Sequence, residues 1–103
     1  MTVSQMSLNH FKLTANLISK EILRFTPAGQ SVTECQLHYL GELLEAGSFR
    51  KVEMQIPAIA IGAIATELQK IELGQLVSLE GFLTHQSLRR LSLVFHITQI
   101  NYS

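Results

Sequence analysis

The sequence contains few of the cysteines that cross-link small proteins through disulfide bonds, and few charged residues. It contains one cysteine, no tryptophan and no aspartate, and charged residues make up 16% of its 103 residues. A single cysteine excludes an internal disulfide framework and a zinc site built from several cysteines. We expect Cys35 to be a small buried residue of a strand, the usual environment of a free cysteine, with a nucleophile or a ligand as the alternative.

Arrangements that support catalysis or metal binding are missing too. The four histidines, at positions 10, 38, 85 and 96, show no ligand spacing such as H-x-x-x-H, and neither G-x-S-x-G nor a phosphate-binding loop occurs. No pair of glutamates suggests acid-base chemistry. We therefore expect no enzymatic activity, no metal site and no cofactor, and we interpret His96 as a structural histidine of a strand.

Long apolar runs are absent as well. The longest, Ile56–Ala65, is interrupted by Pro57 and Gly62 and is too short to span a bilayer. Residues 1–10 have neither the basic start nor the apolar core of a signal peptide. The sequence contains no repeat or linker, so it predicts one domain, residues 1–103. We expect the protein to be cytoplasmic and to make no contact with a membrane.

Apolar content and balanced charge are what the chain does have. Hydrophobic residues make up 47% of it, and eight Lys or Arg residues balance eight Glu residues, so the formal net charge is zero. Sparse charge on a small protein predicts that apolar surface is covered by a subunit interface. A site for a polyanion would have to arise from local segregation of the basic residues.

Alternating apolar and polar residues predict three strands in the first half of the chain. They cover residues 10–17, 32–40 and 49–56, with a tight turn at Thr26–Gly29 and a connection at 41–48. Proline cannot donate to a strand ladder, so Pro57 is expected to end the third strand. The expected inward residues are Phe11, Leu13, Ala15 and Leu17, then Thr33, Cys35, Leu37 and Tyr39, then Val52, Met54 and Ile56.

The second half predicts a helix followed by two strands. Residues 58–73 read as the helix, with Gly74 as its C-terminal stop. In the strand at 74–83, Gly81 marks a bend or the close approach of another backbone. A polar, basic loop (84–90) precedes the last strand, whose core face is expected to be Leu91, Leu93, Phe95 and Ile97. Three strands, a helix and two strands are the element order of an OB-fold, a five-stranded Greek-key barrel that is all-β except for one helix between strands three and four.

The pattern G-x-x-V-x-L-E-G-x-L at residues 74–83 is similar to the fourth strand of bacterial single-stranded-DNA-binding proteins. Asn9, Leu13, Leu17, Pro27, Gly29 and Val32 resemble their first two strands. Within this group the chain resembles the short primosomal members, because it ends soon after the last strand without an acidic tail and contains the phrases TPAG (26–29) and MQIPA (54–58). The resemblance covers nearly the whole chain.

This resemblance implies a non-enzymatic homodimer that binds single-stranded DNA during replication restart, together with the primosomal helicase and other primosome proteins. The alternative is an OB-fold adaptor that binds proteins and touches DNA little. Binding to single strands requires cations spaced along the phosphates and flat side chains on which bases stack. The candidate cations, which could also be ordinary solvated charges, are Lys20, Arg24, Arg50, Lys51, Arg89 and Arg90.

Candidates for stacking are fewer. Phe11, Phe25, Phe95 and Tyr39 are expected in the core. Phe49 is expected to face outward, where it could stack on a base or pack under a loop or at a dimer seam, and His38 and His85 are secondary candidates. Glu53 stands where the family places an aromatic residue, so we expect weaker DNA binding than is typical of the family.

Overall fold

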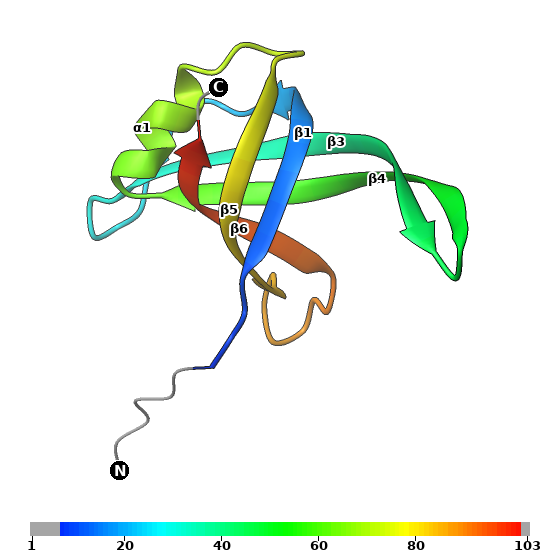
Figure 1. Cartoon of the computed structure of the whole chain (residues 1–103). Coiled ribbons are helices and arrows are strands. Elements are labelled where there is room, and N and C mark those ends of the chain that lie inside the picture. The colour runs from blue at the N-terminus through cyan, green and yellow to red at the C-terminus, as the bar shows by residue number, and fades with distance from the viewer. Residues whose placement is uncertain (1–6, 102–103) are drawn as a thin grey trace.

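The computed structural model describes residues 7–101 and shows one long, curved sheet with a single helix (Figure 1). The elements in chain order are β1 (Phe11–Lys20), β2 (Arg24–Phe25), β3 (Ser31–Glu45), β4 (Ser48–Ile61), α1 (Ala63–Gln69), β5 (Leu76–His85) and β6 (Leu93–Asn101).

The sheet closes on itself into a barrel. Its strand order is β1-β5-β6-β4-β3-β2, and an additional pairing between β1 and β3 joins the two ends. The two-residue strand β2 only pairs with the edge of β3. Five strands therefore form the barrel, and α1 lies between the third and the fourth of them, which confirms the predicted OB-fold.

Alternation along β1 and β3 identified most of their core residues correctly. Leu13, Ala15 and Leu17 are buried on β1, and Thr33, Cys35 and Leu37 on β3. Phe95 at the centre is fully buried and meets the edge of Phe11, with ring centroids 4.9 Å apart and planes at 89°. The free cysteine is a core residue as expected.

The helix is shorter than predicted, and the strand before it is longer. Strand β4 continues through Pro57 to Ile61, and α1 ends at Gln69, five residues before Gly74. Pro57 is tolerated because parallel pairing of β4 with β6 begins only at Ala58, so no partner on that side needs an N–H from residue 57. The predicted helix is therefore present, but its bounds, 58–73, and its stop at Gly74 were wrong.

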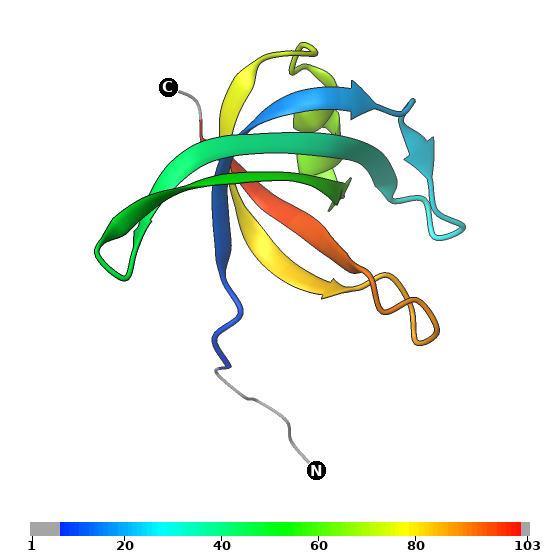
Figure 2. The same ribbon diagram turned by 90° about the vertical axis from the view of Figure 1, so that its right-hand side faces the viewer.

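The predicted connection at 41–48 is also wrong, because most of it is a hairpin. Strands β3 and β4 stay paired up to Glu45 and Ser48, which leaves only Ala46 and Gly47 as the turn. Both turn residues have positive φ, 52° and 80°, as in the two-residue turns whose twist matches that of a hairpin. Residues 40–53 thus form an arm that projects beyond the barrel (Figure 2); we call it the β3–β4 arm.

Three residues expected in the core lie on the surface. Leu91 and Leu93 are 67% and 50% exposed, because the loop at 86–92 and the first residue of β6 extend past the barrel wall. Phe25 is 65% exposed, because it belongs to the short β2 at the outer edge of the sheet.

Gly81 is a point of close backbone approach, as predicted. A Cβ atom at this position would lie 1.7 Å from the main-chain oxygen of His96. The pairing of β5 with β6 shifts register here, since Glu80 faces Gln99 whereas Gly81 faces Ile97, which makes Thr98 the extra residue of a β-bulge.

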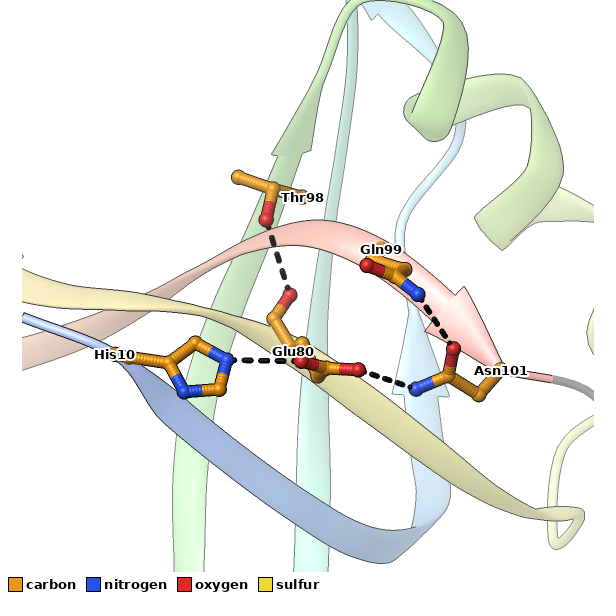
Figure 3. Close-up of polar contacts among 5 residues, drawn as sticks. All are labelled: His10, Glu80, Thr98, Gln99 and Asn101. Carbon is orange, nitrogen blue, oxygen red and sulfur yellow. Dashed lines mark hydrogen bonds and ion pairs between the residues drawn. The ribbon is translucent and has the colours of Figure 1, made fainter.

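Glu80 gathers polar groups from two other segments, the residues before β1 and strand β6, around this bulge (Figure 3). Its carboxylate accepts a hydrogen bond from Asn101 Nδ2 at 2.8 Å and lies 2.8 Å from His10 Nε2. Its main-chain oxygen accepts from the Thr98 hydroxyl at 3.4 Å. The two contacts to the carboxylate, that from Asn101 first and that with His10 second, lower the pKa of Glu80.

Polar side chains attach α1 to the end of the barrel. The buried Thr33 hydroxyl donates to the main-chain oxygen of Ala65 at 2.9 Å and accepts from Gln69 Nε2 at 3.1 Å. Lys20 Nζ donates to the main-chain oxygens of Gln69 and Ile71, both at 2.7 Å. A cation at the C-terminal end of a helix satisfies carbonyls that have no partner within it. No helix in residues 7–101 has the length and apolar character to cross a membrane.

Candidate nucleic-acid interface

An open groove of about 430 Å³ lies on the outside of the barrel. One wall is Arg24 of β2, the other is Arg90 with its neighbours in the 86–92 loop, and the floor includes Ile59 of β4 and His96 of β6. The segments on either side of it, residues 21–30 and 86–92, connect the first two and the last two barrel strands. Figure 2 shows both connections on the side of the barrel away from the β3–β4 arm.

Strand register builds the floor of this groove. Glu34 of β3 pairs with Ile59 of β4, Ile59 pairs with His96 of β6, and His96 pairs with Phe82 of β5. Directly paired residues point to the same face of a sheet. Four strands therefore contribute one side chain each to a continuous row across the outer surface.

Two of these side chains form a ring pair. The rings of Phe82 and His96 are stacked, with centroids 4.9 Å apart and planes at 16°. Phe82 is 37% exposed, and His96 is partly buried. Burial lowers the pKa of His96, because removing water disfavours the charged ring.

Arg24 and Arg90 line the groove, whereas Arg89 is next to Arg90 in the chain and does not line it. Arg24 forms an ion pair with Glu34 across β2 and β3. Arg89 and Arg90 have no ion pair within residues 7–101. Their backbone N–H groups donate to the Ser87 hydroxyl, at 3.3 and 3.0 Å, so the two arginines belong to a tight local turn.

Lys20 is placed differently from the other predicted cations. Its ammonium group is half-buried and donates to the carbonyls at the end of α1. That contact gives Lys20 a structural task, and it does not line the groove.

Of the remaining predicted residues, the β3–β4 arm carries Phe49, Arg50 and Lys51. His38 lies on β3 just before the arm, opposite Gln55, and His85 ends β5 opposite Leu93. Arg50 forms an ion pair with Glu45 at 2.5 Å. In the strand register of the hairpin, Lys51 lies opposite Glu42. Phe49 is 71% exposed beside the turn and lies opposite Leu44.

His38 of β3, two residues before the arm, contacts Glu53 of the arm. His38 Nε2 lies 2.8 Å from a carboxylate oxygen of Glu53. This hydrogen bond, helped by the charge of Lys51, lowers the pKa of Glu53. The arm thus holds a carboxylate that stays ionised at neutral pH, at the position where the resemblance places the family's aromatic residue.

The groove unites Arg24 and Arg90 from the predicted set and leaves the arm residues apart from it. Sequence reasoning missed Phe82 and His96. Alternation with the buried Leu79 and Gly81 already placed Phe82 outward, so a large exposed aromatic was a usable signal. Groups of three or more potential metal ligands do not occur between residues 7 and 101.

Comparison with known proteins agrees with this architecture. The model of a family described as "Another single-strand binding protein family" matches residues 9–99. Together with the closed barrel, this places the chain in the class of single-strand-binding OB-fold proteins.

Within that class the chain belongs to the family of the replication restart protein PriB. The PriB proteins of Bordetella pertussis and of Neisseria meningitidis serogroup C are 33% and 36% identical to it. The alignments cover 89% and 92% of this chain and 86% and 95% of those proteins. The solved structure of PriB from Ralstonia solanacearum superposes with a TM-score of 0.84 at 35% identity, over 94% of this chain and all of that one.

Proposed function

We propose that the protein binds single-stranded DNA in the groove between residues 21–30 and 86–92, as a non-enzymatic accessory of replication restart in the cytoplasm. The observation that carries this proposal is the position of the groove. OB-folds bind oligonucleotides over their second and third barrel strands, between these two connections. Here those strands are β3 and β4, and each connection or its neighbouring strand supplies an arginine to the groove.

The chemistry of the groove suits a phosphodiester chain without sequence selection. Arginines contact phosphates, and Ile59 and His96 offer flat or apolar surface on which bases can lie. Because Arg24 is already paired with Glu34, we expect Arg89 and Arg90 to supply most of the attraction.

We further propose that the protein works as a homodimer with the primosomal helicase and other primosome proteins. Relatives named replication restart proteins support this role. Leu40, Leu44 and Phe49 lie on one face of the arm and are 55%, 65% and 71% exposed, which is apolar surface that a second copy can bury. Sedimentation that shows only monomers at micromolar concentration would refute the homodimer.

Titration of a fluorescent oligonucleotide at several salt concentrations tests DNA binding. For single strands, the logarithm of the affinity falls by about 0.7 per contacted phosphate for each unit of log salt. Arg89→Glu with Arg90→Glu should lower the affinity and flatten this slope. The matched control is Lys12→Glu with Lys70→Glu, which changes the net charge equally at exposed sites outside the groove.

Equal losses in both double variants would mean that only net charge matters, and the groove would be withdrawn as the site. No measurable binding by the unaltered protein at low salt would favour the adaptor function instead.

A further inference from the structure

We propose that the Phe82–His96 ring pair is a base-stacking subsite, in which one unpaired nucleobase lies in the groove against His96 while Phe82 supports His96 from behind. The inference rests on the proposed function and adds to it the place where a base, as opposed to a phosphate, is held. It also sets the course of the strand, across β4, β6 and β5 and away from the β3–β4 arm.

The geometry of the two rings carries this proposal. They are nearly parallel, at 16°, and their centroids are 4.9 Å apart, which is an offset stack that a third flat ring can extend. His96 lines the groove between Arg24 and Arg90. A base on His96 would therefore have a cation on either side for its neighbouring phosphates.

The protonation state of His96 favours stacking on a base over binding to a phosphate. Because burial lowers its pKa, the ring is neutral at pH 7 and offers a flat face without a full charge. Ile59 from β4, paired with His96, provides apolar surface beside the ring. The arginines nearby supply the charge that the histidine lacks.

The arm, by contrast, is a poor path for phosphates. Three glutamates (Glu42, Glu45 and Glu53) accompany its two cations. Each of those cations lies beside a carboxylate, since Arg50 contacts Glu45 and Lys51 faces Glu42. Phe49 is exposed there, but no excess of positive charge would hold the backbone over it.

Substitutions of His96 distinguish a flat ring from a charge or a hydrogen bond. His96→Phe keeps the ring and removes both nitrogens, so we expect the affinity for an oligothymidine to be unchanged or higher. His96→Ala removes the ring and should lower the affinity about tenfold or more, in line with the loss of one stacked base. The same Ala substitution should leave the affinity for an abasic strand of equal length unchanged.

If His96→Phe loses as much affinity as His96→Ala, the histidine acts through its nitrogens and the stacking subsite is refuted. Thermal melting of both variants checks that the barrel is intact. The unaltered protein reports separately on the proposed function. Binding of the oligothymidine with no effect of either His96 variant would refute the subsite alone, whereas no binding at any salt concentration would refute the proposed function.

Fluorescence provides a second readout that does not depend on affinity. The chain has no tryptophan, so Phe82→Trp and Phe49→Trp each create a single reporter, one in the ring pair and one on the arm. Saturating oligothymidine should quench the tryptophan at position 82 and leave that at position 49 nearly unchanged. Quenching at position 49 alone would place the bases on the arm and overturn the proposal.

Discussion

Replacement of Gly81 by alanine should destabilise the barrel far more than a glycine-to-alanine change usually does. The added Cβ would lie 1.7 Å from the His96 oxygen, 2.8 Å from the His96 carbonyl carbon and 3.0 Å from the Phe95 ring. Two of these three atoms are backbone, so no side-chain rotation relieves the contact.

The magnitude follows from how far β5 and β6 must separate. Real Cβ atoms essentially never come closer than 3.0 Å to another heavy atom, so the strands would have to move apart by about 1.3 Å. Overpacking costs about 1–3 kcal/mol, and each weakened backbone hydrogen bond adds about 1 kcal/mol. We therefore expect a loss of about 3–4 kcal/mol in the free energy of unfolding, which lowers Tm by about 12 °C or more in a domain of this size.

Gly74→Ala is the matched control, because it adds a Cβ atom where there is room for it and so tests only the cost of the backbone conformation. Gly74 has φ of 86°, and no atom lies within 4 Å of the position that an added Cβ would take, so alanine there meets only the left-handed backbone penalty of about 1–2 kcal/mol. Urea denaturation of the three proteins gives the comparison. If Gly81→Ala costs no more than Gly74→Ala, the close approach of β5 and β6 is refuted.

Three further predictions concern charged groups. Lys20→Met should lower the free energy of unfolding by about 2 kcal/mol in urea, because two carbonyls at the end of α1 lose a charged donor, whereas Lys12→Met should change it little. Glu80 has a lowered pKa in the fold, so its contribution to stability is present above its unfolded pKa, about 4.3, and is lost as pH falls through the folded pKa. The stability difference between the unaltered protein and Glu80→Gln should accordingly shrink in melts from pH 5 to pH 3, and a constant difference would contradict the bond from Asn101. Glu53→Gln should leave the affinity for an oligonucleotide of about four nucleotides, which the groove can hold, unchanged in the salt titration, because Glu53 lies on the arm and does not line the groove.

The alternation of apolar and polar residues predicted the barrel strands, because each strand buries one face and exposes the other. Alternation identified the inward residues of β1, β3 and β4 without knowledge of their partners. It failed where long-range pairing decides the structure. The apolar run after Pro57 looks helical by itself, yet Ala58 and Ala60 are buried because they pair with Phe95 and Ile97 of β6.

The site could be predicted only in part, for the same reason. Arg24 and Arg90 were found because they lie in connections that OB-folds use around their ligand. The ring pair was not, because Phe82 and His96 come together only through the β5–β6 register. Nothing in the sequence near His96 shows that Ile59 and Phe82 lie on either side of it.

That register ties the stability of the barrel to the proposed binding site. Ile97 and Ile100 are both buried although they are three residues apart, which strict alternation in a strand forbids. The bulge at Thr98 resolves this conflict, and it moves Phe82 from a position opposite Ile97 to one opposite His96. Paired residues share a face, so without the bulge Ile97 would lie on the outer surface beside Phe82, and His96 would point into the barrel instead of into the groove. The bulge that lets β6 bury two isoleucines therefore also builds the ring pair.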